Sequence, residues 1–168
     1  AGASSPGSRD AGTAVAEAIF GDVNPGGKLP VTIARSVGQL PVFYNVKPSA
    51  RRGYLFDTTE PLFPFGFGLS YTRFEIGAPR LATPRIAKDR TVEVAVDVRN
   101  VGMRAGDETV QLYVRDKIAS LTRPVKELKA FERVTLAPGE MRTVRFTLDE
   151  RAFRFWNAEM KRVVEPGE

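Results

Sequence analysis

From position 92 the chain reads Val92-Glu93-Val94-Ala95-Val96-Asp97-Val98-Arg99, with valine at every second residue. Successive side chains of a β-strand point to opposite faces of the sheet, so this alternation predicts a strand with one apolar and one largely polar face. A helix would spread the valines around its surface, because its period is 3.6 residues. The stretch therefore predicts a sheet that buries its valine face.

Two later stretches repeat the pattern. Val110, Leu112 and Val114 form one alternating run, and residues 144–148 form another. Turn-forming residues separate the runs, at 100–102 and 137–140. Short strands with these spacings predict a mainly β fold from about residue 74 onward, an antiparallel β-sandwich. The side chains predicted to face inward are Val94, Val96, Leu112, Val114, Val144, Phe146 and Leu148.

The residues before this β region have a different character. Residues 1–9 are rich in Gly, Ser and Pro and are predicted to be a disordered or junction segment. A short helix is predicted from Asp10 to a C-cap at Gly21, and a short strand over residues 29–33. Prolines interrupt every regular pattern from 34 to 72, which predicts an irregular, aromatic-rich segment that needs a partner surface. The rings expected in a seam between two domains are Phe63, Phe65, Phe67 and Tyr71.

The composition excludes several kinds of chemistry. The 168 residues contain no cysteine and no histidine, which rules out disulfides, thiolate metal sites, cysteine nucleophiles and the commonest general base within this sequence. We expect no metal and no cofactor. The net charge of +5 is interleaved with acidic residues, which favours a solvated surface over nucleic-acid binding. No apolar run is long enough to cross a membrane, and the first residues lack the apolar core of a signal peptide.

Three features could carry ligand chemistry, and each has a structural alternative. The loop from Gly21 looks like a phosphate-binding loop, but Leu29 stands where that motif needs Ser or Thr, so a tight turn is the better interpretation. The basic loop with Arg52 and Tyr54 could bind sugar hydroxyls or pin itself to an acidic surface. Trp156 could stack on a sugar, although a lone Trp beside a strand is more often in a core or a seam.

Two long blocks resemble a known family. The first resembles the end of the second domain of family 3 β-glucosidases and β-xylosidases, and it consists of Gly21-Asp22-Val23-Asn24-Pro25-Gly26-Gly27-Lys28-Leu29-Pro30-Val31-Thr32 followed by Pro61-Leu62-Phe63-Pro64-Phe65-Gly66-Phe67-Gly68-Leu69-Ser70-Tyr71-Thr72-Arg73-Phe74. The second resembles the fibronectin type III-like domain that follows in the same enzymes, and it includes residues 94–100, Gly106-Asp107-Glu108-Thr109-Val110-Gln111-Leu112-Tyr113-Val114 and Pro124-Val125-Lys126-Glu127-Leu128-Lys129-Ala130-Phe131. The resemblance extends from about Asp10 to the last residue.

The resemblance implies a domain organisation. Residues 10–73 correspond to the C-terminal remnant of the α/β sandwich domain and its linker. Residues 74–168 correspond to an immunoglobulin/fibronectin III-like antiparallel sandwich, which is expected to lack its last strand and to expose an open edge.

The resemblance also implies a function for the parent protein. The family hydrolyses β-linked glucosides or xylosides with retention, using a carboxylate nucleophile and a carboxylic acid/base. Both of these residues belong to regions of the family that precede the block at Gly21. We therefore expect this segment to be structural, with no catalytic residue, in a β-glucosidase or β-xylosidase acting on plant-type oligosaccharides. Arg52 and Tyr54 are the candidate substrate-binding residues, because their loop matches a stretch near the active-site rim.

The expected partners follow from the same assignment. They are the remainder of the parent enzyme, a β-linked oligosaccharide and, through exposed rings and the open edge, further copies of the chain. No nucleic acid or membrane partner is expected, and the parent is predicted to be periplasmic or extracellular. Two alternatives stay open at this point: an independent carbohydrate-binding module, or a sandwich that binds a protein partner.

Overall fold

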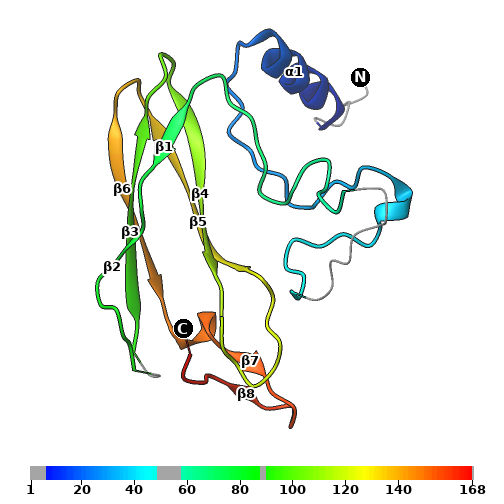
Figure 1. The fold of residues 1–168 in the computed structure, drawn as a ribbon. Coiled ribbons are helices and arrows are strands. Elements are labelled where there is room, and N and C mark those ends of the chain that lie inside the picture. Colours follow the sequence, from blue (N-terminus) through cyan, green and yellow to red (C-terminus); the bar gives the residue numbers. More distant parts are fainter. Residues whose placement is uncertain (1–6, 49–57, 88–89, 168) are drawn as a thin grey trace, which may run out of the picture.

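Two antiparallel β-sheets face each other in the part of the chain that follows residue 73 (Figure 1). The computed structural model describes residues 7–48, 58–87 and 90–167. In the larger sheet, β3 (Val92–Asn100) is central, with β6 (Met141–Leu148) along one edge and the short strands β1 (Phe74–Ile76) and β2 (Arg80–Leu81) along the other. The second sheet pairs β4 (Gly106–Val114) with β5 (Glu127–Leu136). The mainly β sandwich predicted from the alternating stretches is confirmed.

The apolar faces of the two sheets meet in one core. Valines of β3 lie opposite β6 in register, with Val94 paired to Phe146 and Val96 to Val144. Five of the predicted inward side chains are buried, and Leu112 packs against the core while remaining partly exposed. Val114, at the end of β4, is half-buried. The core cluster consists of Val96, Val98, Val110, Val134, Leu136, Val144 and Phe146.

The turn predicted after β3 is built around one buried amide. Asn100 is 0% exposed, and its side-chain nitrogen donates to the carbonyls of Arg104 (2.7 Å) and Leu136 (3.0 Å). Its side-chain oxygen accepts from the Thr72 hydroxyl (2.8 Å) and the Gly102 amide (3.0 Å). Because all these groups are paired, the buried amide locks the β3–β4 turn to both sheets instead of destabilising the core.

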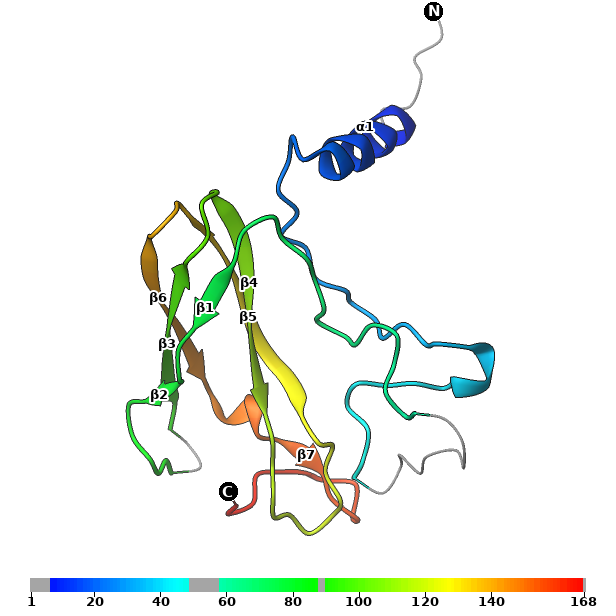
Figure 2. The ribbon, with the colours of Figure 1, turned by 45° about the horizontal axis from the view of Figure 1, so that its top comes forward.

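The N-terminal helix is longer than the sequence suggested. Helix α1 (Gly7–Phe20) begins three residues before the predicted start, so residues 7–9 are helical rather than disordered or junction. The helix ends at Gly21, whose φ of +84° is the left-handed conformation expected of a C-cap. In two views the helix stands away from the sandwich (Figures 1 and 2).

The strand predicted over residues 29–33 does not form. This stretch instead exchanges five backbone hydrogen bonds with residues 62–67, among them Leu29 N to Phe67 O (2.8 Å) and Ile33 N to Phe63 O (2.8 Å). Only the Ile33–Phe63 bridge has β geometry, because Pro30 has no amide proton to continue a ladder. A short 3₁₀ turn, η1 (Val37–Gln39), follows.

The last part of the chain closes the lower end of the sandwich in Figure 1. It contains η2 (Glu150–Ala152) and the antiparallel pair β7 (Phe155–Trp156) and β8 (Arg162–Val163). Trp156 is 56% exposed, so it does not lie in the core. Among the described residues, no helix is long and apolar enough to span a membrane.

Candidate functional site: a polar seam along strand β4

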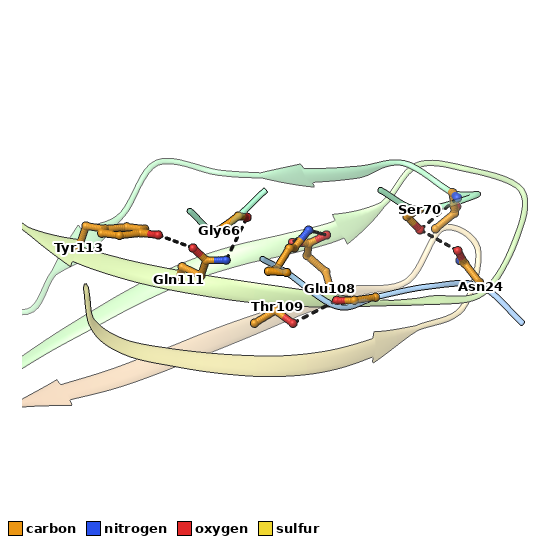
Figure 3. A network of polar contacts seen from close by, with 10 residues as sticks. Asn24, Gly66, Ser70, Glu108, Thr109, Gln111 and Tyr113 are labelled. Atoms are coloured by element: carbon orange, nitrogen blue, oxygen red, sulfur yellow. Dashed lines mark hydrogen bonds and ion pairs between the residues drawn. The ribbon is translucent and has the colours of Figure 1, made fainter. Parts of the chain in front are cut away.

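The N-terminal segment, defined as residues 7–73, runs along strand β4 and is joined to it mainly by polar contacts (Figure 3). The Thr109 hydroxyl donates to the carbonyl of Gly26 (3.3 Å), and the Gln111 amide donates to the carbonyl of Gly66 (3.3 Å). The Tyr113 hydroxyl donates to Gln111 Oε1 (2.5 Å) and orients that amide. We call this set of contacts, with those described next, the seam.

An ion pair lies at the centre of the seam. Lys28 Nζ is 2.8 Å from Glu108 Oε1 and 3.1 Å from Oε2, and the two side chains are 18% and 11% exposed. Charges with so little access to water are stabilised only while they remain paired, since removal of one partner leaves the other desolvated. The pair therefore ties the first block of the family-like sequence to β4.

The upper end of the seam is held by Asn24. Its side-chain oxygen accepts from the Ser70 hydroxyl (3.0 Å) and the Tyr71 amide (2.8 Å), and its nitrogen donates to the Ala105 carbonyl (3.1 Å). Beside it, Arg104 donates to the carbonyl of Gly21 (2.5 Å). One side chain thus connects the turn at 24–27, the segment at 70–71 and the β3–β4 loop.

Gly66 shows why the seam needs its particular backbone. Its φ is +80°, a conformation that residues with a side chain rarely adopt. A Cβ added there would clash with Gln111 Oε1 and lie 2.8 Å from the Tyr113 hydroxyl. The close approach lets the Gly66 carbonyl reach the Gln111 amide.

Aromatic rings continue the seam toward its lower end. Tyr44 stacks on Phe65 with ring centroids 4.1 Å apart and meets Tyr113 edge-on at 6.1 Å. The Tyr44 hydroxyl accepts from the Leu128 amide (3.2 Å), and the Val46 carbonyl accepts from the Val125 amide (2.9 Å). Burial, and then the neighbouring Tyr44, raise the pKa of Tyr113 above its ordinary value.

The other rings predicted for a domain seam are less covered. Phe67 is half-buried, whereas Phe63 is 39% and Tyr71 is 51% exposed. Phe63 packs on Phe67 with centroids 5.0 Å apart, and the Tyr71 hydroxyl donates to the Ala18 carbonyl (2.6 Å). Of the four predicted rings, Phe65 is the one stacked in the aromatic part of the seam.

The candidate substrate-binding residues Arg52 and Tyr54 lie outside the described residues. Within the described ranges, no group of three or more His, Cys, Asp or Glu side chains could hold a metal ion. The phosphate-loop resemblance at 21–28 is explained by the seam, because Asn24 and Lys28 bind protein groups. What these described residues assemble is a docking surface between the N-terminal segment and strand β4.

Comparison with known proteins assigns the two sides of the seam. Residues 3–71 match the glycosyl hydrolase family 3 C-terminal domain, and residues 108–168 match the fibronectin type III-like domain. The chain belongs to glycoside hydrolase family 3. The seam therefore joins segments of two family 3 domains.

Individual family 3 relatives resemble most of this chain. A β-xylosidase of Formosa agariphila is 52% identical over 161 residues, covering 94% of this chain and 22% of the relative. A periplasmic β-glucosidase of Salmonella typhimurium is 45% identical, with 94% and 22% covered. The solved structure of a β-glucosidase from Erythrobacter marinus superposes with a TM-score of 0.89 at 52% identity, covering 92% of this chain and 21% of that protein. The chain thus spans about a fifth of the length of these relatives.

Sequence reasoning did not find the residues of the seam. Thr109, Gln111 and Tyr113 alternate with the core residues of β4, a pattern that is also typical of a solvent-facing strand. Lys28 and Glu108 are 80 positions apart, so no local pattern pairs them. The one available signal was the mixture of glycine, asparagine and lysine in the 21–28 block, which is unusual for a plain turn.

Proposed function

We propose that this chain is the structural, non-catalytic C-terminal part of a retaining β-glycosidase, a β-glucosidase or β-xylosidase acting on plant-type oligosaccharides. The observation that carries the proposal is the seam, which fixes the last segment of one family 3 domain against the sandwich of the next. The names of the relatives, β-xylosidase and β-glucosidase, supply the reaction.

In such a protein the chemistry belongs to two carboxyl groups that flank the glycosidic bond, one as nucleophile and one as acid/base. Productive catalysis needs these groups held within a fraction of an ångström by rigid surroundings. A sandwich that clamps the end of the preceding domain contributes this rigidity without supplying a catalytic group. Loss of the clamp is then expected to reduce stability first and turnover second.

The partner of the N-terminal segment is, in this proposal, the remainder of the parent enzyme. Helix α1 exposes apolar side chains that a helix packed on its own domain would bury, since Ile19 is 68% and Phe20 is 83% exposed. The segment beyond it continues the pattern, with Val37 at 88% and Leu69 at 71% exposed. Exposed apolar side chains this frequent are typical of a surface that another part of a protein covers.

The same exposed surface leads us to propose self-association of the isolated chain. At micromolar concentration we expect dimers or larger assemblies in light scattering, together with binding of a hydrophobic dye. A clean monomer that binds no dye would show that the N-terminal segment covers itself. We also propose a periplasmic or extracellular location for the parent, in keeping with the name of the Salmonella relative.

Activity assays on two lengths of the protein test the central proposal. The isolated chain should not hydrolyse aryl β-glucosides or β-xylosides above background, whereas the complete protein should hydrolyse at least one of them. Turnover by the isolated chain that disappears when one of its carboxylates is mutated would overturn the non-catalytic assignment. A complete protein without glycosidase activity would overturn the proposed reaction.

A further inference from the structure

The hairpin formed by β7 and β8 presents the single tryptophan of the chain to solvent. Phe155 points inward and is 5% exposed, with the Arg123 guanidinium 4.5 Å from its ring centroid. Arg123 is held in turn by Glu127, at 2.7 Å. Because neighbouring side chains of a strand point to opposite sides, this anchor fixes Trp156 outward, where it is 56% exposed.

A cation lies beside the exposed indole. Arg162 is the cross-strand neighbour of Trp156, and its guanidinium carbon is 6.0 Å from the ring centroid. Among the described residues, the Arg162 guanidinium has no ion pair or side-chain hydrogen bond, so its donors are available. The guanidinium lies over the indole ring in a cation–π arrangement and offers a planar set of N–H groups there.

The turn that joins the two strands is rigid. The Asn157 amide donates to the Lys161 carbonyl (3.0 Å), and the Met160 amide donates to the Asn157 carbonyl (3.1 Å). The Lys161 amide donates to the Asn157 side chain (2.9 Å). These bonds hold Trp156 and Arg162 in place before any ligand arrives, which reduces the entropy lost on binding.

We propose that Trp156 and Arg162 form a binding platform for a β-linked pyranose chain of the xylan or glucan type. In a β-linked pyranose the hydroxyls are mostly equatorial, so both ring faces present axial C–H groups that can pack flat on an indole. The hydroxyls lie around the rim of the sugar ring, where the N–H groups of a guanidinium next to the indole can donate to them. An indole provides a large, rigid contact area, and arginine supplies the hydrogen bonds.

Isolated exposed apolar side chains are common on proteins and need no explanation by themselves. This one differs because an anchored hairpin holds it outward and an unpaired guanidinium flanks it. A membrane surface is the other partner that exposed Trp and basic residues can fit. Attachment to anionic lipid needs a cluster of several basic residues, whereas this hairpin carries only Lys161 and Arg162, next to the acidic Glu159, so the sugar is the occupant that we propose.

The inference goes beyond the proposed function, because it assigns sugar binding to the sandwich and not to an active site. It can be tested on the isolated chain, whose only tryptophan makes intrinsic fluorescence a direct report on this site. Titration with xylohexaose or cellohexaose should shift and quench the emission in a saturable way, with a dissociation constant on the order of 1 mM. No spectral change up to about 10 mM of either sugar would overturn the proposal.

Variants distinguish sugar binding at Trp156 and Arg162 from non-specific adsorption to exposed apolar side chains. In affinity electrophoresis through soluble xylan or glucan, Trp156→Ala should weaken binding about tenfold or more, and Arg162→Gln by a few fold. Phe131→Ala is the matched control, because Phe131 is an equally exposed ring (68%) on strand β5, and it should bind as the parent chain does. Equal retardation of Trp156→Ala and the parent chain would overturn the proposal, as would binding to anionic vesicles without binding to either sugar. A catalytically inactive complete protein would leave this result unaffected.

Discussion

The sandwich and the N-terminal segment achieve order in different ways. Among the described residues, the twelve buried side chains of the hydrophobic core lie between Val92 and Phe155, and in the N-terminal segment only Gly26 and Pro61 are buried. The sandwich therefore carries its own core. The segment is held by an ion pair, side-chain hydrogen bonds to backbone carbonyls and the edge-on contact of Tyr44 with Tyr113. Because of this difference, a mutation in the sandwich core should unfold the sandwich, whereas a mutation in the seam should release the N-terminal segment and leave the sandwich folded.

The largest effect is expected in the sandwich core. Leu136 is 0% exposed, and Leu136→Ala should lower the free energy of unfolding by about 2–5 kcal/mol, since it leaves a cavity that β-sheets cannot close. Leu69→Ala, at a position that is 71% exposed in the N-terminal segment, should change it by less than about 0.5 kcal/mol. Urea unfolding followed by circular dichroism measures both. Equal losses would mean that the segment shares the sandwich core.

The ion pair of the seam tests how the segment is held. Glu108→Ala leaves Lys28 desolvated and unpaired, and it should cost about 1–3 kcal/mol, between the values for exposed and fully buried pairs. The loss should appear as faster proteolysis within residues 7–73, with the sandwich still protected.

Glu93→Ala is the control for that variant. Glu93 pairs with Arg145 at the surface, where the Arg145 side chain is 62% and the Glu93 side chain 45% exposed. Loss of so exposed a pair should have little effect on stability. The double variant Lys28→Met with Glu108→Met should recover much of the protection, because no charge is left unpaired. Unchanged proteolysis in Glu108→Ala would show that the ion pair does not hold the segment.

A backbone variant sharpens the same comparison. Gly66→Ala places a side chain at φ +80° and against the Gln111 amide, and it should destabilise the docked segment by about 1–2 kcal/mol. Gly27→Ala is the neighbouring control, since a Cβ there meets no atom within 4 Å. Hydrogen exchange of residues 62–67 measures the difference, and similar exchange in the two variants would contradict the close approach at Gly66.

The smallest effect concerns pH and belongs to the outer face of the sandwich. Hydrogen bonds from Arg80 and then from Thr143 lower the pKa of Asp97 to about 2. A carboxyl whose pKa is lowered in the folded state stabilises the fold above its unfolded value of about 3.9. This stabilisation is lost as the pH falls from about 4 to about 2.

Thermal unfolding from pH 7 to pH 2 tests that dependence. Asp97→Asn should unfold at a lower temperature than the parent chain at pH 7, and the two should converge toward pH 2. A difference that stays constant over this range would assign the effect to lost packing instead of to the charge.

The sequence by itself determined the sandwich. The alternation in residues 92–99 and 144–148 marks one buried face, and it translates into strands β3 and β6 because the period of a strand is local and exact. The turn at 100–102 and the helix end at Gly21 were likewise predictable, since each depends on one residue's own conformation or side chain. The absence of histidine and cysteine from the sequence needed no structure.

Where local patterns were weak, the sequence-based prediction was wrong or no prediction could be made. The predicted strand at 29–33 fails because Pro30 within it and Pro64 in its partner, residues 62–67, both interrupt a regular ladder. The predicted lack of a last strand in the sandwich stays a prediction, as does the role of Arg52 and Tyr54. Trp156 was interpreted as more typical of a core or a seam than of a sugar platform, and the hairpin keeps it out of the core of the sandwich, since Phe155 occupies the inward position.

Only the tertiary structure decided the seam. Lys28 meets Glu108, Asn24 meets Ala105, and Gln111 meets Gly66, across separations of 80, 81 and 45 residues. Polar side chains on the outer face of a strand look the same in sequence whether water or another segment covers them. Which of the two covers them depends on a segment that is distant in sequence, so no local periodicity reveals the contact. That segment can pack in this way only once the sandwich has formed the surface that it contacts.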